Sequence, residues 1–235
     1  MESISLTAET PSAYFPNRYR RWHVVAGALL LVGVAWLFGA IAEDVATADT
    51  ITQIDQQLAD WLHARATPLT TKAMLAVSAM HGVLPITLAT GALALLLLLR
   101  RRRRWMLVLL LAVPGGMLLN TLTKFVFARN RPHFDDPIVF LTSYSFPSGH
   151  TAGSTLLYGF VAAFLIAHAQ SRAARIAIAA LALLLVALVA SSRIYLGAHF
   201  MSDVMAAFFE SLAWLTLCGT LVYVFAARRV GRQGV

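Results

Sequence analysis

A turn from Pro147 to His150 precedes a long apolar stretch and combines several groups that can hold an anion. Pro147 ends the preceding structure, because its ring fixes φ and removes a backbone donor. Ser148 and Gly149 place a hydroxyl and an unhindered backbone where a helix begins, and the free N–H groups at that end attract anions. His150 can carry a proton near neutral pH. The turn is therefore either an anion site with an acid–base group or an ordinary helix cap.

A second polar group has the spacing of an activated histidine. Ser192 and Arg193 are followed by His199 and Asp203, which are four residues apart and are predicted to share one face of a helix. A carboxylate that binds one imidazole nitrogen leaves the other nitrogen free to act as a nucleophile. In isolation, the same pair is also compatible with a structural hydrogen bond.

A third group consists of two cations, Lys124 and Arg131, with Pro132 directly after the arginine. Arginine makes forked contacts with phosphate oxygens, and lysine supplies a compact point charge. The alternative is ordinary loop charge. Basic residues on the exterior side of a membrane would, however, run against the usual bias of positive charge toward the cytoplasm.

Composition indicates that these groups are held by a membrane protein. The 235 residues are 59% hydrophobic and only 13% charged, whereas a soluble domain has about 25% charged residues. The formal net charge of +8 does not indicate nucleic-acid binding, because the basic residues cluster at the ends of apolar stretches, where they set topology. The single cysteine, Cys218, excludes an intramolecular disulfide.

Six apolar stretches are long enough to cross a bilayer at about 1.5 Å per residue. They are 23–42, 83–99, 105–123, 151–168, 176–191 and 202–226. Gly82 and Pro85 predict a break before the second stretch, and Pro114 predicts a kink in the third. The expected fold is all-α: a polytopic bundle of six transmembrane helices over residues 23–227, with tails at 1–22 and 228–235.

Basic clusters predict the orientation of this bundle. They lie at 18–21, 100–104, 172–175 and 228–232. Because positive charge is retained on the cytoplasmic side, both termini are expected there. The loops near 43–67, 125–149 and 192–203 then share the exterior side, so all three polar groups are expected to lie on one face.

The first exterior loop is predicted to contain a short amphipathic helix. Thr50 and Gln53 have the form of a capping box. Apolar residues then recur at helical spacing: Ile51, Ile54, Leu58, Trp61 and Leu62. This extracytoplasmic helix either lies on the bilayer surface or packs onto the end of the bundle. Ahead of it, 40–42 resembles a signal-peptidase site, but the apolar stretch is longer than a usual signal, so cleavage stays open.

Taken in order, the three polar groups resemble the signature motifs of the type 2 phosphatidic acid phosphatase superfamily. Those motifs are K-x6-R-P, P-S-G-H and S-R-x5-H-x3-D. The sequence matches every signature position between Lys124 and Asp203. The six-span layout extends the resemblance over most of the chain.

The resemblance implies a metal-independent phosphoric ester or anhydride hydrolase without a cofactor. His199 would attack phosphorus, Asp203 would orient it, and His150 would protonate the leaving group and then act as a base toward water. The residues implied to hold the phosphate oxygens are Lys124, Arg131, Ser148, Gly149 and Arg193. Ser192 is expected to be structural, and Arg129 and His133 have no signature role.

The expected substrate is a membrane lipid phosphate or a polyprenyl diphosphate, of the phosphatidic acid, phosphatidylglycerol phosphate or undecaprenyl diphosphate type. The enzyme is expected in a bacterial inner membrane, with its site facing the periplasm. The alternatives are a lipid phosphotransferase and a non-catalytic anion binder or transporter. A binder needs cations but no acid–base pair, so His150 and His199 argue against it. No nucleic-acid partner is expected, and the oligomeric state stays open.

Overall fold

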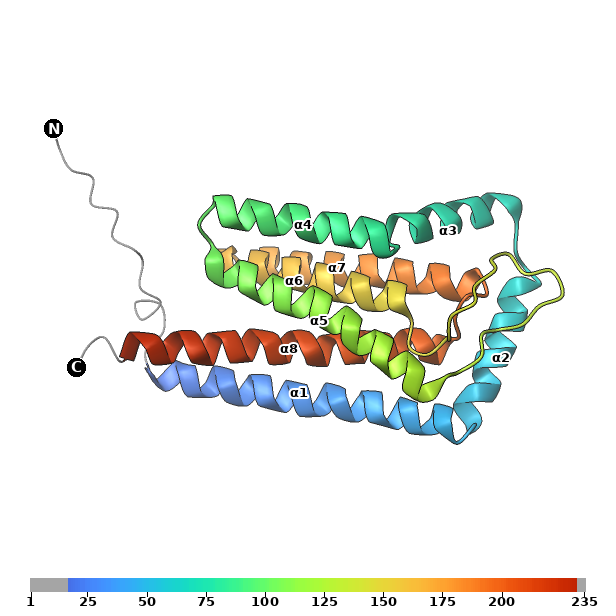
Figure 1. Ribbon diagram of the computed structural model, residues 1–235, viewed down its shortest axis with the longest axis horizontal. Coiled ribbons are helices and arrows are strands. Elements are labelled where there is room, and N and C mark those ends of the chain that lie inside the picture. The colour runs from blue at the N-terminus through green and yellow to red at the C-terminus, as the bar shows by residue number, and fades with distance from the viewer. Residues whose placement is uncertain (1–16, 232–235) are drawn as a thin grey trace.

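The structure is a computed structural model that describes residues 17–231. This part of the chain forms eight helices and no strand, which confirms the predicted all-α fold (Figure 1). The helices are α1 (Asn17–Ala46), α2 (Thr50–His63), α3 (Pro68–Met80), α4 (Val83–Leu99), α5 (Arg103–Phe127), α6 (Gly149–His168), α7 (Arg172–Tyr195) and α8 (Met201–Gly231). Residues 1–16 and 232–235 of the predicted tails lie outside the described residues.

Six membrane spans fit these helices. By length and composition, α1, α5, α6, α7 and α8 can each cross a membrane, and α3 with α4 supplies a sixth span if the pair is counted as one. The pair is bent by 45° at Gly82, where the sequence predicted a break. At Pro114, where the sequence predicted a kink, α5 continues as one helix. α1 begins at Asn17 and α8 extends to Gly231, beyond the tail boundaries drawn from the sequence.

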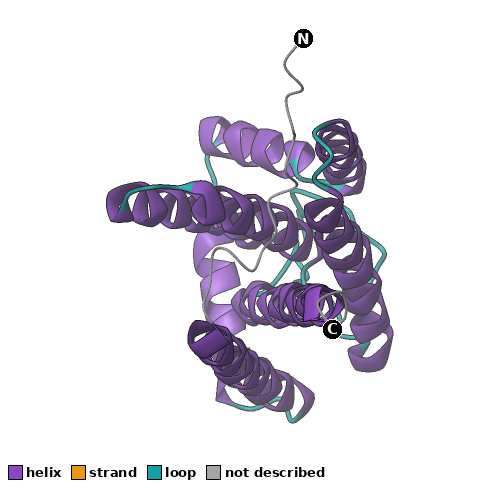
Figure 2. Cartoon of the chain, turned by 90° about the vertical axis from the view of Figure 1, so that its left-hand side faces the viewer, coloured by secondary structure: helices purple, strands orange, loops and turns teal. Residues whose placement is uncertain are grey.

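A buried apolar core lies where α4, α5 and α6 meet, with Trp214 and Leu215 of α8 packed against it, and it holds α6 against α5. Leu109, Leu156 and Phe160 are fully or almost fully buried there. Gly116 permits the close approach, because a Cβ at this position would lie 2.6 Å from a methyl carbon of Leu156 and 3.0 Å from the indole of Trp214. The view along the bundle shows the spans packed side by side (Figure 2). This packing fixes the position of the first turn of α6, where Ser148 and His150 lie.

α2 crosses one end of the bundle and packs against α1, α7 and α8 (Figure 1). Of the two readings of the amphipathic helix, the structure supports packing onto the bundle end. Its buried positions include a charged residue, Asp55, beside Ala59. Ile54 and Trp61, which belong to the predicted apolar pattern, are 46% and 52% exposed, so these two side chains do not pack into the bundle.

The predicted capping box of Thr50 and Gln53 at the start of α2 is wrong. Asp49 is the N-cap, and its carboxylate accepts a hydrogen bond from the backbone N–H of Thr50 at 2.6 Å. Thr50 is therefore the first residue inside the helix. Aspartate is among the preferred N-cap residues, so Asp49 takes this position ahead of Thr50.

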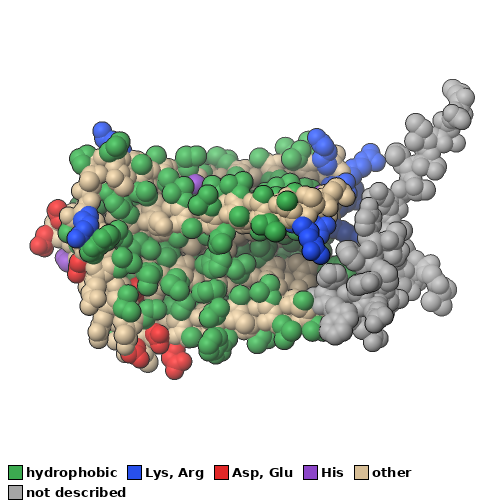
Figure 3. All heavy atoms as spheres, turned by 180° about the vertical axis from the view of Figure 1, so that it is seen from behind, with side chains coloured by type: hydrophobic (Ala, Val, Ile, Leu, Met, Phe, Trp, Pro, Cys, Tyr) green, Lys and Arg blue, Asp and Glu red, His purple; other side chains and the backbone are tan. Residues whose placement is uncertain are grey.

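The two ends of the bundle differ in charge and content. The α4–α5 turn, the α6–α7 turn, the start of α1 and the end of α8 lie at one end, and α2 with the α5–α6 and α7–α8 loops lies at the other (Figure 1). In Figure 3, most blue side chains gather at the right-hand end, where the α4–α5 turn lies, and the red side chains lie toward the left-hand end beside a few blue ones. This segregation agrees with the positive-inside pattern of the sequence.

We therefore predict that the α2 end faces the exterior and the α4–α5 turn faces the cytoplasm. The test uses Asp135→Cys and Arg102→Cys, each in a chain that also carries Cys218→Ala, and an impermeant maleimide. Asp135→Cys should be labelled in intact cells, and Arg102→Cys only after the membrane is permeabilised. Labelling of Arg102→Cys but not Asp135→Cys in intact cells would show that the bundle has the opposite orientation in the membrane.

Candidate active site

Three segments bring the motif residues together at the α2 end of the bundle. Lys124 lies in the last turn of α5, and Arg131 follows on the α5–α6 loop. Ser148 caps α6, and Gly149 and His150 form its first turn. Arg193 lies in the last turn of α7, His199 on the α7–α8 loop, and Asp203 in the first turn of α8. The backbone N–H of Ser148 donates to the carbonyl of Asp203 at 3.0 Å, which ties the start of α6 to the start of α8.

The His199–Asp203 pair exists, but not for the reason the sequence suggested. α8 begins at Met201, so His199 lies before the helix and the two residues do not share a helical face. The loop nevertheless places His199 Nδ1 3.5 Å from Asp203 Oδ2. The backbone N–H of Phe200, which donates to Asp203 Oδ2 at 2.9 Å, fixes this loop against the carboxylate.

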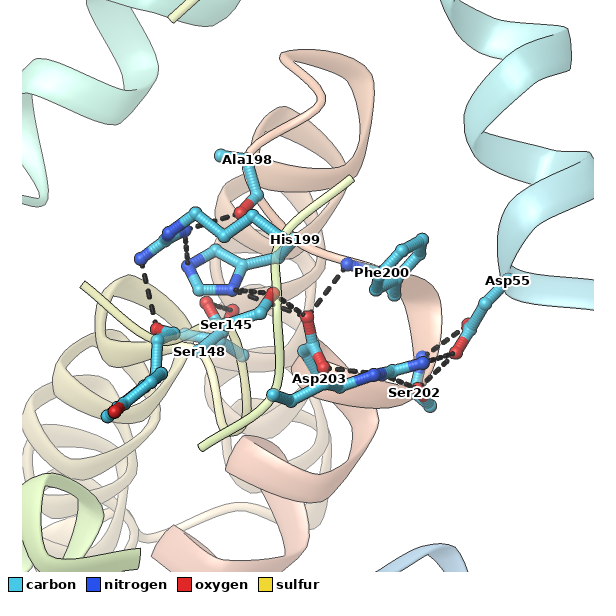
Figure 4. Close-up of polar contacts among 12 residues, drawn as sticks. Asp55, Ser145, Ser148, Ala198, His199, Phe200, Ser202 and Asp203 are labelled. Atoms are coloured by element: carbon cyan, nitrogen blue, oxygen red, sulfur yellow. Dashed lines mark hydrogen bonds and ion pairs between the residues drawn. The ribbon is translucent and has the colours of Figure 1, made fainter. Parts of the chain in front are cut away.

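Ser145 joins the two residues (Figure 4). Its hydroxyl donates a short hydrogen bond to Asp203 Oδ2 and lies 3.4 Å from His199 Nδ1. A serine hydroxyl has one proton to donate, and here it goes to the carboxylate. The serine oxygen can then accept from His199 Nδ1–H. Sequence reasoning missed Ser145, although it lies only two residues before Pro147.

The opposite nitrogen of His199 faces Arg131. Arg131 Nη1 lies 3.2 Å from His199 Nε2, and a guanidinium can only donate. Nε2 must therefore be the unprotonated nitrogen, and Nδ1 carries the hydrogen toward Ser145 and Asp203. This tautomer presents the lone pair of Nε2 on the side of the cations, as a nucleophile for an anionic substrate requires.

Burial keeps the His199 ring neutral. The ring is 2% exposed, and its pKa is lowered to about 3, chiefly by burial. Asp203 acts against this shift, while the charges of Arg131 and Lys124 lower the pKa of His199 further. The cations thus contribute to the neutral state of His199, but they are a smaller cause than burial.

All three cations of the motifs are held by hydrogen bonds within the protein, two of them to backbone carbonyls. Lys124 Nζ donates to the carbonyl of Tyr144 at 2.8 Å, and Arg131 Nε donates to the carbonyl of Ser143 at 2.6 Å. The guanidinium of Arg193 donates to Ser78 of α3 through a short hydrogen bond. Its Nε is buried and has no partner among the described residues. Arg193 is thus the cation with a donor still available on its buried side.

His150 lies in the first turn of α6, beside the α3–α4 break. A Cβ added at Gly82 would lie 3.8 Å from His150 Nε2. The neighbouring His81 hydrogen-bonds to the carbonyl of Val77 and to the hydroxyl of Tyr158, at 2.7 and 2.6 Å, and so connects this break to α6.

Sequence reasoning missed a further set of residues around Asp203. Arg129, which was set aside as having no signature role, donates to Asp203 Oδ1 at 2.6 Å. Asp55 and Ser202 complete the set. The sequence carries only part of this signal, because Arg129 lies inside the first motif. Among the described residues, no group of three or more His, Cys, Asp or Glu side chains is placed to hold a metal ion.

Residues 105–229 match the family described as the PAP2 superfamily. The chain belongs to this superfamily. It is also 39% identical to phosphatidylglycerophosphatase B of Bacillus subtilis (strain 168) over 93 residues, which are 39% of this chain and 45% of that protein. The aligned stretch thus spans less than half the length of this PAP2-type relative.

Solved structures agree with the PAP2 fold. The chain is similar to the crystal structure of the first transmembrane PAP2 type phosphatidylglycerolphosphate phosphatase from Bacillus subtilis, with a TM-score of 0.70 and 27% identity over 81% of this chain and 94% of that one. It also shares a fold with LpxE of Aquifex aeolicus, with a TM-score of 0.55 and 21% identity over 72% of this chain and 94% of that one. The resemblance drawn from the three motifs is therefore confirmed at the level of family and fold.

The lowered pKa of His199 predicts how stability responds to pH. Between the ordinary value of 6.5 and about 3, the unfolded chain binds a proton at this histidine and the folded chain does not. Stability should therefore fall as pH falls through this window, by roughly 2 kcal/mol between pH 6.5 and 5. Thermal unfolding in detergent, followed by tryptophan fluorescence near pH 7.5 and pH 5, should show a larger loss for the wild type than for His199→Asn. An equal loss in both proteins would contradict the neutral, buried state of this ring.

Proposed function

We propose that this chain is a membrane phosphatase that removes phosphate from a lipid phosphate or polyprenyl diphosphate through a phosphohistidine at His199. The observation that carries the proposal is the orientation of His199, whose Nε2 faces Arg131 at 3.2 Å while Nδ1 faces Ser145 and Asp203. A protein that only bound anions would have no use for a buried, oriented and neutral imidazole among its cations.

In the first step, His199 Nε2 attacks phosphorus and the bond from phosphorus to the leaving oxygen breaks. His150, in protonated form, gives its proton to that oxygen and releases the lipid alcohol or lipid phosphate. The phosphorylated imidazole is positively charged and retains its Nδ1 hydrogen. Asp203 stabilises that charge directly and through the hydroxyl of Ser145.

In the second step, neutral His150 takes a proton from water, and the resulting oxygen attacks phosphorus. The bond from phosphorus to Nε2 breaks, inorganic phosphate leaves, and both histidines return to their starting states. Neither step requires a metal ion or a cofactor. We therefore propose that activity persists in the presence of chelators.

The proposed phosphate site consists of Lys124, Arg131, Ser148, Gly149 and Arg193. Preorganised donors of this kind usually supply the largest share of catalysis, because they stabilise charge without having to reorganise. Two observations support this assignment. Arg193 has a buried Nε without a partner among the described residues. A Cβ added at Gly149 would meet only Asn120 Oδ1, at 3.7 Å, so packing within the protein does not require glycine there.

The position of the site supports a lipid substrate. Lys124 ends one membrane span and His150 begins another, so the phosphate would bind at about headgroup depth. Directly after Lys124 in the chain, the apolar side chains of Phe125 and Val126 are 69% and 78% exposed. Acyl or prenyl chains can lie along these side chains and stay in the bilayer while the phosphate enters the site. A water-soluble phosphate ester would gain nothing from such an arrangement.

Similarity to proteins named phosphatidylglycerophosphatase makes phosphatidylglycerol phosphate the first lipid to test. Phosphatidic acid and undecaprenyl diphosphate are the other candidates. We place the enzyme in the bacterial inner membrane, with the site facing the periplasm and both termini in the cytoplasm, on the basis of the basic clusters alone.

The test measures phosphate release by purified protein across these lipids, glucose phosphate and a nucleotide, all in the same detergent micelles with a chelator present. We expect kcat/KM for at least one long-chain lipid to exceed that for glucose phosphate by at least about a hundredfold. Each chain methylene that transfers from water to an apolar surface contributes roughly 0.8 kcal/mol, although micelle residence already supplies most of it. His199→Asn serves as the inactive control.

Equal kcat/KM for glucose phosphate and every long-chain lipid would overturn the lipid assignment. Phosphate transfer to an added lipid alcohol without release of inorganic phosphate would identify a phosphotransferase instead. Unchanged activity in His199→Asn would show that His199 is not the nucleophile.

A further inference from the structure

A buried ion-pair network connects the candidate active site to α2, a helix that carries none of the three motifs (Figure 4). Arg129 donates from Nη1 to Asp203 Oδ1 at 2.6 Å and from Nη2 to Asp55 Oδ2 at 2.8 Å. The guanidinium thus lies between two carboxylates that are each 74 residues away along the chain. Asp203 is 0% exposed and Asp55 is 1% exposed, so water does not screen these contacts.

The network is fixed from every side. Asp55 Oδ1 accepts from the backbone N–H of Ser202 at 2.9 Å, and Asp55 Oδ2 accepts a short hydrogen bond from the Ser202 hydroxyl. Arg129 Nη1 also donates to that hydroxyl at 2.7 Å, and its guanidinium carbon lies 4.4 Å from the ring centroid of Phe200. Asp55 therefore binds Arg129 and the first turn of α8 together.

The charge of this network matters for His199. Asp55, Arg129 and Asp203 together carry a net charge of −1, counted as two carboxylates and one guanidinium. Without Asp55, Arg129 would neutralise Asp203 and leave no net negative charge beside the imidazole. Without Arg129, two buried carboxylates would lie close together, and one of them would tend to bind a proton instead of supporting His199.

We propose that Arg129 and Asp55 are positioning residues for the phosphohydrolase reaction, acting through Asp203. They hold the carboxylate in place and set the single net negative charge that stabilises His199 when it becomes positive on phosphorylation. The inference rests on the proposed function. It makes α2, which carries no signature motif, a required part of the site.

A charge-balance cycle tests this. Asp55→Asn changes the net charge of the network to 0, Arg129→Gln changes it to −2, and the double variant restores −1 with side chains that can still hydrogen-bond to each other. We expect each single variant to lower kcat by at least about tenfold with little change in KM, because neither residue touches the substrate. The double variant should recover at least about fivefold in kcat over the slower single variant.

Two controls accompany the cycle. Asp60→Asn removes an exposed carboxylate of α2 that accepts a hydrogen bond from Gln56 of the same helix, and it should leave kcat unchanged. Thermal midpoints of all the variants report folding separately from turnover. If Arg129→Gln does not fold, the double variant is compared with Asp55→Asn alone. Its kcat should still exceed that of Asp55→Asn by at least about fivefold.

Additive losses in the double variant, or single variants as active as the wild type, would overturn the inference while the proposed function stands. A rise in KM without a fall in kcat would also overturn it, because that result would place these residues in substrate binding. A wild-type protein that releases phosphate from no lipid would overturn the proposed function, and the inference with it.

Discussion

The described structure depends on a single buried carboxylate, that of Asp203. A charge removed from water is costly unless it is paired and hydrogen-bonded. Asp203 meets this requirement with partners from two loops: Arg129 and Ser145 on the α5–α6 loop, and the backbone of Phe200 on the α7–α8 loop. Its own carbonyl accepts from Ser148 at the start of α6. The segments that carry the candidate active site are thus held together where they meet this residue.

The same arrangement explains how a loop can form part of a rigid site. The α5–α6 loop has no regular structure between Ala128 and Pro147, yet Lys124 and Arg131 donate to its carbonyls at residues 143–145. These cations bind the loop before any phosphate arrives. Because their side chains are already ordered, a bound phosphate would require little further loss of conformational entropy.

Much of this could be predicted from the sequence, because the signals were local. Apolar stretches bounded by arginines predicted the membrane spans, and Gly82 and Pro85 predicted the break between α3 and α4. The spacing of the motif residues indicated the family. What could not be predicted depends on pairs far apart in sequence. Nothing local indicates that Arg129 would meet Asp55, 74 residues earlier, or that Ile54 would face outward so that Asp55 could face inward. His199 and Asp203 meet through a loop and a serine, where i and i+4 spacing suggested a helix.

The central claim is that His199 Nε2 becomes covalently bound to phosphorus during turnover. The most direct measurement mixes the enzyme with a lipid phosphate labelled with ³²P, quenches the reaction in alkali, and locates the label by digestion and mass spectrometry. We expect an alkali-stable, acid-labile phosphoryl group on His199 that is absent from His199→Asn. Rapid formation of the lipid alcohol with no phosphoryl group on the protein, or with the group on His150 instead, would contradict it.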